Sequence, residues 1–415
     1  MEIDKTTLND LSLFNSEEEF SVFHKLNNTR TARGREQLRV NFNTPLLTIE
    51  AIEGVQQTIQ SILSKEEQWP LQISNGTIMV IEKFYLAAID EIPANPSAFT
   101  VYNYKIFHSA DYALVKYSIK HAFDFIKGMQ AIVQHFLQED SPKPLQRLLL
   151  NAKQILNKNQ FVIVQKSTKI EDLSLAQQLH LVAFLRYHYK QNMFELLAIY
   201  AQLDAWYGMG QSMKEYKLVF PQFINGDQPI IAAKALRHIL LANPVSYDVT
   251  LHQQSNFMFL TGANMAGKST FIKSVGTAVF LAHIGIGVPA QEMQLSFFDG
   301  LLSNINVLDN LQKGESYFYN EVQRIKATID KVSNGKKWLI LIDELFKGTN
   351  VEDAMKCSST VIEGLLKIKS SLFILSTHLY EIGAGLKKYP NISFNYFETT
   401  ITEQREGVVN MLDRL

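Results

Sequence analysis

The chain has 415 residues, enough for roughly two or three domains, and its 40 Lys and Arg against 41 Asp and Glu leave a formal charge of −1. This balance excludes a histone-like polycation and an acidic disordered protein, although a basic stripe on one face could still bind nucleic acid. A single cysteine, Cys357, excludes a disulfide framework and indicates a reducing compartment. With no secretory signal and no apolar run of about 18 residues, we expect a cytoplasmic protein without a membrane partner.

The first half of the chain, residues 1–212, reads as a helical domain. Long stretches lack Gly and Pro, and apolar residues recur three and four positions apart. We expect one helix from Asp111 to Gln138 and another from Ser174 to about Tyr207, joined by a basic connection that contains Pro142 and Pro144. Two long helices with a basic connection suggest an arm with an exposed far end; the alternative is an ordinary solvated helical surface.

The second half, residues 213–415, has the sequence pattern of an α/β domain. Short apolar runs at 257–260, 338–342 and 372–375 are each followed by polar or glycine residues and then by a helical pattern. Strands that are apolar on both faces and alternate with helices predict a mostly parallel sheet covered on both sides. Ligands in such folds bind at the carboxyl ends of the strands, where the polar clusters of this sequence fall.

The strongest motif follows the first of these runs and fits G-x-x-x-x-G-K-[ST], the phosphate-binding loop. Its glycines allow backbone N–H groups to face phosphate oxygens, its lysine supplies a positive charge, and its serine hydroxyl can bind Mg²⁺. The alternative is a glycine-rich turn without a ligand. The motif predicts ATP binding by Gly262, Ala263, Asn264, Met265, Ala266, Gly267, Lys268 and Ser269.

Polar residues also end the other two predicted strands. Asp343 is placed to hold Mg²⁺ together with Ser269, and Glu344 can polarise the water that attacks the γ-phosphate. His378, at the tip of the third strand, could reach the γ-phosphate or that water. The alternatives are a solvated strand end for the acidic pair and a hydrogen-bonded structural role for the histidine.

Five stretches resemble, in order and spacing, motifs of the MutS family of mismatch-repair ATPases, a branch of the ABC-type ATPases. They are 261–270 (TGANMAGKST), 282–290 (AHIGIGVPA), 309–318 (DNLQKGESYF), 343–350 (DELFKGTN) and 376–381 (STHLYE). The resemblance adds Thr270 and Asn243 to the ATP-binding set. It also implies that Gly314 and Ser316 form a signature that caps the γ-phosphate held by a partner subunit, so a homodimer is expected.

The resemblance continues more weakly into residues 1–212, which it identifies as a core and lever domain ahead of the ATPase domain at 213–415. The sequence offers no counterpart for the family's N-terminal mismatch-recognition domain, little room for its DNA-clamp insertion, and an end before its dimerising helices. We therefore expect a short form of the family. The aromatic residue that often stacks on adenine in the family is replaced by Leu240.

Taken together, these residues predict a MutS-like DNA-binding protein in which ATP hydrolysis at a composite dimer site drives helical arms on DNA. Branched or mismatched duplexes are the expected DNA partners, in mismatch repair or recombination control. The alternative is a nucleotide-gated ATPase that binds a protein partner instead of DNA. A transporter's motor subunit is disfavoured because the signature lacks the L-S-G-G-Q form.

Overall fold

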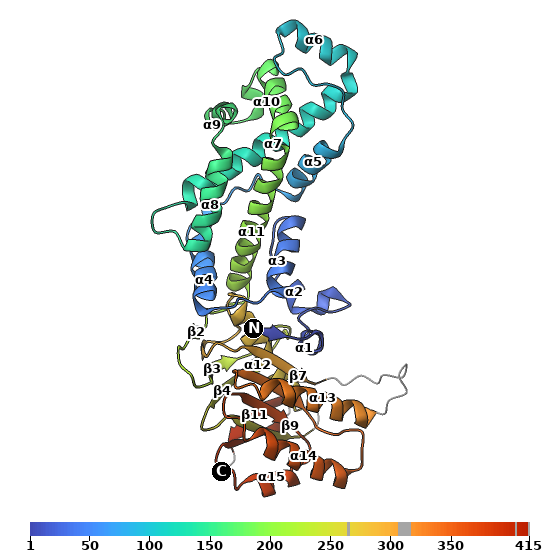
Figure 1. Ribbon diagram of the computed structural model, residues 1–415, viewed down its shortest axis with the longest axis vertical. Coiled ribbons are helices and arrows are strands. Elements are labelled where there is room, and N and C mark those ends of the chain that lie inside the picture. Colours follow the sequence, from blue (N-terminus) through green and yellow to red (C-terminus); the bar gives the residue numbers. More distant parts are fainter. Residues whose placement is uncertain (264–265, 306–316, 403–404, 414–415) are drawn as a thin grey trace. The chain divides into compact units, whose positions relative to one another are not determined.

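The computed structural model (Figure 1) describes residues 1–263, 266–305, 317–402 and 405–413. The chain divides into two units: unit 1 contains Met1–Leu26, Thr44–Glu53 and Ser212–Leu415, and unit 2 contains Asn27–Asn43 and Gly54–Gln211. The predicted division of the chain into domains at 1–212 and 213–415 stays a prediction. The two units differ from it because two N-terminal segments are grouped with the C-terminal residues.

Unit 1 is built around a sheet with the strand order β1-β7-β8-β9-β5-β10-β11. Neighbouring strands are parallel from β1 to β10, and within the described part of this sheet only β10 and β11 pair antiparallel. This confirms the predicted α/β class with a mostly parallel sheet. The bounds of the strands are β1 Glu2–Ile3, β5 Phe257–Gly262, β7 Gly300–Asn304, β8 Trp338–Asp343, β9 Leu372–Ser376, β10 Ile392–Thr402 and β11 Arg405–Asp413.

Helices pack on both faces of this sheet because its central strands are apolar on both sides. On one face, Ile340 and Ile342 of β8 join a buried cluster with Ile362 of α14. On the other face, a Cβ on Gly276 of α12 would lie 2.5 Å from a methyl of Leu341, so the missing side chain permits close packing. The helices of unit 1 are α1 Lys5–Asp10, α2 Val22–Lys25, α12 Lys268–His283, α13 Tyr317–Val332, α14 Val351–Leu365 and α15 Glu381–Leu386.

A second sheet of unit 1 has the order β2-β6-β3-β4. Its strands are β2 Gln222–Phe223, β3 Ile230–Leu236, β4 Tyr247–His252 and β6 Glu292–Leu295. Buried and exposed residues alternate along β4 and β6, which is the pattern of a sheet with one packed face and one solvated face. Strands β2, β3 and β4 precede β5 in the chain, whereas β6 follows it.

Unit 2 is built from helices whose apolar faces pack around α7. A Cβ on Gly128 of α7 would lie 2.7 Å from Ile73, and Trp69 stacks on Tyr207 with ring centroids 4.5 Å apart. The helices are α3 Ala32–Asn43, α5 Asn75–Leu86, α6 Ala98–Phe107, α7 Ser109–Phe136, α8 Lys143–Leu156, α9 Val162–Lys166 and α10 Leu175–His188, and the unit boundary crosses α4 Ile49–Leu63 and α11 Lys190–Glu215.

Helix α7 confirms the helix predicted from Asp111, but the single helix predicted from Ser174 to Tyr207 is wrong. The segment forms two helices, α10 and α11, that are separated at Tyr189, where the backbone takes φ −124° and ψ 5°. The Tyr189 ring is buried and its hydroxyl donates to the carbonyl of Ile155 at 2.9 Å. An apolar repeat continues across this break because both helices bury the same kind of face, so periodicity does not reveal it.

Among the described residues, no helix combines the length and the apolar character needed to cross a membrane.

Candidate nucleotide-binding site

The loop after β5 has the backbone of a phosphate-binding turn at both of its motif glycines. Gly262 has φ 143° and Gly267 has φ 92°, a region that side chains with a Cβ rarely adopt. A Cβ on Gly262 would lie 2.7 Å from the carbonyl oxygen of Phe397. Gly267 is the N-cap of α12, so the positive end of this helix faces the loop. Asn264 and Met265 lie outside the described residues.

Lys268 begins α12 and is buried. Its Nζ donates to the carbonyl oxygens of Gly262 at 2.8 Å and Ala263 at 2.9 Å. Burial lowers the pKa of this ammonium, while the charges of Glu344 and Asp343 act in the opposite direction. A desolvated cation held only by neutral carbonyls is stabilised when an anion enters the loop. A phosphate site needs this property.

Asp343, the last residue of β8, is buried and connects the loop to β9. Its Oδ2 accepts a hydrogen bond from Ser269 Oγ at 2.5 Å, and its Oδ1 accepts one from Ser376 Oγ. The register of the sheet places Asp343 opposite Ser376 at the carboxyl ends of neighbouring strands. The structure therefore brings the two residues predicted to hold Mg²⁺ into direct contact, and a hydroxyl beside a carboxylate is an oxygen donor set that Mg²⁺ accepts.

Glu344 follows Asp343 with a left-handed backbone, φ 65°, and its N–H donates to the carbonyl of Ser376 at 2.9 Å. Its carboxylate lies between an imidazole and an ammonium group, with Oε1 3.3 Å from His378 Nδ1 and Oε2 3.3 Å from Lys347 Nζ. Burial by itself would raise the pKa of Glu344, but Lys347 and then His378 outweigh it and hold the pKa below its usual range. The carboxylate is therefore ionised near neutral pH and able to accept a proton from water.

Glu321 of α13 is a residue of this site that the sequence does not reveal. It is buried, and its carboxylate accepts hydrogen bonds from the backbone N–H groups of Lys347 and Gly348, both at 3.2 Å. It therefore holds the turn that carries Lys347 toward Glu344. Burial raises the pKa of Glu321, and the two N–H groups oppose this shift. Its spacing from the acidic pair matches no motif, so only the folded turn identifies it.

The other residues predicted to bind ATP make no contact described above with Lys268, Asp343 or Glu344. Thr270 lies half-buried in the first turn of α12, Ala266 is buried and Asn243 is exposed in the loop between β3 and β4. Leu240, at the position where the family pattern often has an aromatic residue, is half-buried. Gly314 and Ser316 lie outside the described residues.

A cluster of three aromatic rings, which the sequence does not predict, packs against the loop after β5. The rings of Tyr247, Phe271 and Phe397 lie 5.2–5.7 Å apart between centroids. The Tyr247 hydroxyl would lie 3.9 Å from a Cβ on Gly267, and burial raises the pKa of this phenol. The cluster packs against both motif glycines and leaves little space for larger residues at Gly262.

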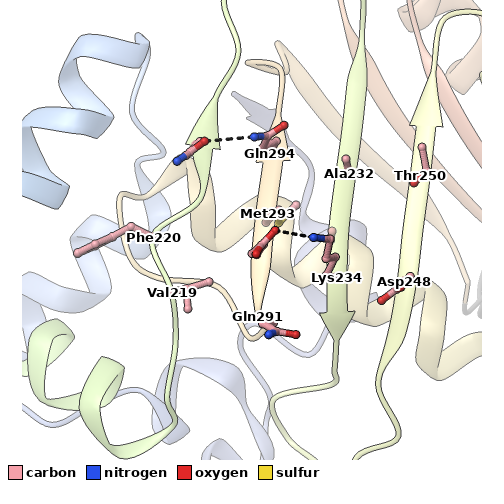
Figure 2. Close-up of a pocket in the computed structure, with 12 residues that line it drawn as sticks. Val219, Phe220, Ala232, Lys234, Asp248, Thr250, Gln291, Met293 and Gln294 are labelled. Atoms are coloured by element: carbon pink, nitrogen blue, oxygen red, sulfur yellow. Dashed lines mark hydrogen bonds and ion pairs between the residues drawn. The ribbon is translucent and has the colours of Figure 1, made fainter.

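A hollow of about 590 Å³ lies on the second sheet of unit 1 (Figure 2). Figure 2 shows Ala232, Thr250 and Gln294 on neighbouring strands that line it. Two of its charged residues pair with each other, since Lys234 Nζ lies 3.0 Å from Glu292 Oε2, and Asp248 accepts the N–H of Ala235 at 2.8 Å. Its lining comes from β2, β3, β4, β6 and adjacent loops, whereas the predicted site residues follow β5, β8 and β9, so we assign it no role in nucleotide binding.

Comparison with known proteins identifies related sequences. Residues 258–414 match the family model of MutS domain V. The chain is 27% identical over 256 residues to the DNA mismatch repair protein MutS of Lysinibacillus sphaericus, covering 59% of this chain and 29% of that relative. It is 32% identical over 213 residues to the DNA mismatch repair protein MSH3 of Vanderwaltozyma polyspora, covering 50% and 20%. It is 35% identical over 149 residues to the DNA mismatch repair protein msh-2 of Neurospora crassa, covering 36% and 16%.

The matched regions span less than a third of each of these relatives. The family match begins at the second residue of β5, extends through all of β11 and includes the loop, the acidic pair and His378. Residues 258–414 therefore match the MutS domain V family, and parts of the chain are similar to DNA mismatch repair proteins.

Proposed function

We propose that this protein is an ATPase that binds ATP and Mg²⁺ at the carboxyl edge of the unit 1 sheet. The observation that carries the proposal is the contact between Ser269 and Asp343, which joins the phosphate-loop helix to the strand that also delivers Glu344. Side chains from three parallel strands and one helix N-terminus converge on this edge. Their charges are arranged as phosphoryl transfer to water requires.

Each residue of this edge has a distinct proposed role. Lys268 exchanges its bonds to backbone carbonyls for the phosphate oxygens, and the N-terminus of α12 adds its partial positive charge. Glu344 accepts a proton from the attacking water, because Lys347 and then His378 lower its pKa and keep its carboxylate ionised. His378, which is half-exposed, orients this carboxylate and is the second candidate for contact with the water.

Mg²⁺ fits the residues present, because Ser269 and Asp343 supply a hydroxyl and a carboxylate oxygen already in contact. When bound, the ion would neutralise charge on the phosphates. Ser376 donates to the second oxygen of Asp343 and so orients this carboxylate, while Ser269 contacts the first oxygen. Positioning of this kind is how a protein keeps a metal ligand in one rotamer.

We further propose that two copies of the chain form composite sites in which Gly314 and Ser316 of one subunit complete the site of the other. In this proposal residues 1–212 are a core and lever domain, mainly helical but with the short strand β1, and residues 213–415 are the ATPase domain. ATP would favour one arrangement of the dimer and hydrolysis the other, which moves the helices on DNA. The names of the relatives, DNA mismatch repair proteins, support DNA as the partner.

The catalytic proposal is tested by ATP binding and turnover in three variants of the full chain. Lys268→Ala should weaken ATP binding at least tenfold, which is about 1.4 kcal/mol. Glu344→Ala should retain binding and lose about a hundredfold or more in hydrolysis. The control is Lys356→Ala, which removes an exposed ion pair with Glu352 and should change neither quantity. Full turnover in the Glu344 variant would refute the role of that residue.

The composite site is tested by mixing two inactive variants. Lys268→Ala and Ser316→Ala should each abolish turnover alone, whereas their mixture should recover part of it, since the heterodimer contains one intact loop facing one intact signature. A mixture as inactive as its components would contradict the dimer proposal. Light scattering with a slowly hydrolysed ATP analogue should show a dimer under the same conditions.

DNA binding is tested by gel shift with homoduplex, mismatched and branched DNA, with and without the ATP analogue. Binding should depend on nucleotide and weaken steeply with added salt, because phosphate contacts release counterions. If turnover is present but DNA does not bind at low salt in either nucleotide state, the alternative of a nucleotide-gated protein-interaction ATPase replaces the DNA proposal.

A further inference from the structure

A cluster of metal-ligating side chains lies in unit 2, where α6 ends and α7 begins. Asp90 comes from the loop after α5, His108 stands at the junction of the two helices, and Asp111 lies in the first turn of α7. One ligand atom from each residue can be chosen so that all three lie within 4.8 Å of one another. His108 Nδ1 is 3.1 Å from Asp90 Oδ2, and the N–H of Asp90 donates to Asp111 Oδ2 at 3.1 Å.

The local backbone holds this arrangement. His108 has φ −123° and ψ 47°, which ends α6 and lets α7 start in a new direction from the next residue. The carbonyl of His108 accepts the N–H of Tyr112 at 2.8 Å, so its backbone position belongs to the new helix. The imidazole and the carboxylate of Asp111 are therefore presented three residues apart at one helix N-terminus, and the loop brings in the second carboxylate.

Tyr104 provides an independent observation. Its side chain is 4% exposed, and its hydroxyl finds no hydrogen-bond partner within the described part of the chain. Its ring stacks on the ring of His108 with centroids 5.4 Å apart. A buried hydroxyl without a partner costs free energy, and the ring that carries this one lies directly against the imidazole of the cluster.

We propose that Asp90, His108 and Asp111 bind a divalent transition-metal cation of the Zn²⁺ class, with the Tyr104 hydroxyl as a further donor to the ion or to a water bound to it. One imidazole nitrogen with carboxylate oxygens is a donor set typical of Zn²⁺, whereas Mg²⁺ and Ca²⁺ prefer oxygen ligands alone. Ligands of a four-coordinate ion lie roughly 3.3 Å apart, so ligand atoms that are now up to 4.8 Å apart must close by as much as about 1.5 Å. Asp90 and His108 are exposed enough to do so.

The ion would tie the loop after α5 to the α6–α7 junction. Without it, these segments are joined by one exposed ion pair and one backbone hydrogen bond, contacts that each contribute little to stability. With it, two carboxylates and an imidazole are bound to a single centre. This site belongs to unit 2 and is independent of the nucleotide proposal, so its test succeeds or fails without reference to ATP turnover.

The test is isothermal titration of the full chain with ZnCl₂ in excess Mg²⁺ and without nucleotide, so that Mg²⁺ competes for all-oxygen sites. We expect one Zn²⁺ per chain, with affinity lowered at least tenfold by His108→Ala and by Asp111→Asn. The matched control is His24→Ala, which removes an exposed histidine of unit 1 and should leave binding unchanged. Co²⁺ should give the visible absorption of a four-coordinate site, and His108→Ala should remove it.

Tyr104→Phe separates metal binding from a purely structural role. Because this variant deletes a hydroxyl without a partner, the metal-free protein should melt at the same temperature or higher. The rise in melting temperature that Zn²⁺ produces should nevertheless shrink, and the affinity should fall several-fold. Zn²⁺ affinity that is unchanged in His108→Ala, Asp111→Asn and Tyr104→Phe, or no binding to the unaltered chain, would overturn the proposal. If one variant fails to fold, the other two still decide it.

Discussion

Asp10 and Arg324 form an ion pair in unit 1 although they are 314 positions apart, with Arg324 Nη2 3.2 Å from Asp10 Oδ2. The same carboxylate oxygen accepts from Ser303 Oγ at 2.6 Å and from the N–H of Ile305 at 3.1 Å. Asp10 is 2% exposed. The N-terminal helix α1 is thereby joined to both β7 and α13, and β1 pairs with β7 beside it.

We expect Asp10→Asn to destabilise the protein by about 3 kcal/mol, because it removes the charge that compensates a partly buried guanidinium. Urea denaturation measures this change. The control is Glu2→Gln, which breaks an exposed ion pair with Lys331 on the same segment and should cost less than about 1 kcal/mol. Equal effects of the two substitutions would show that burial of the Asp10 network does not matter.

A second prediction concerns the first glycine of the phosphate loop. Gly262→Ala places a Cβ 2.7 Å from the Phe397 carbonyl at a backbone angle of φ 143°, so both sterics and conformation oppose it. We expect a loss of about 2 kcal/mol in the free energy of unfolding and weaker ATP binding. Gly364→Ala is the control, since α14 offers open space there and alanine favours a helix; it should stabilise by about 0.5–1 kcal/mol. If Gly262→Ala left the free energy of unfolding unchanged, the strain expected at this position would be contradicted.

Glu321 yields a third prediction. Glu321→Ala removes both acceptors of the turn at Lys347 and Gly348, so Lys347 is no longer held toward Glu344. We expect turnover to fall about tenfold while ATP affinity changes less than about twofold, because the turn positions the carboxylate of Glu344, which we propose is catalytic, and not the loop after β5. Single-turnover hydrolysis and nucleotide titration measure the two effects. Glu352→Ala, an exposed carboxylate on α14, should change neither.

The fourth prediction is an acid-sensitive stability due to His283. This residue is fully buried; its Nδ1 donates to the Val279 carbonyl at 2.7 Å and its Nε2 accepts from the Phe298 N–H at 3.0 Å. Burial lowers its pKa from 6.5 to about 4, and the hydrogen bonds to Val279 and Phe298 offset only part of this shift. The unfolded chain therefore binds a proton first as pH falls. The stability contributed is complete above pH 6.5 and is lost progressively toward pH 4, by up to about 3 kcal/mol.

Urea denaturation at several pH values between 7 and 4 checks this slope. His283→Gln should be less stable at pH 7 but should lose less on acidification, because it has no proton to bind. His238, whose pKa burial also lowers to about 4, leaves a remaining slope in that variant. An identical pH dependence in both proteins would contradict the assignment to His283.

Local features of this protein are predictable from short stretches of sequence. The runs at 257–260, 338–342 and 372–375 form β5, β8 and β9, because residues that are apolar on both faces have one stable place, the middle of a covered sheet. The loop glycines take the left-handed angles that their motif requires. The sequence also predicts that Lys268, Asp343 and His378 lie at one edge of the sheet, because the carboxyl ends of parallel strands meet at the same edge.

The sequence by itself therefore determined the mostly parallel α/β sheet, the phosphate loop and the edge on which its acidic partners lie, because each depends on a few adjacent residues. Tertiary structure alone decided that Glu2–Ile3 joins this sheet, that Glu321 holds the turn beside Glu344, and that Asp90 approaches His108. These contacts join residues far apart in the chain or separated by irregular turns. No local period encodes them, and they exist only once packing has brought the segments together.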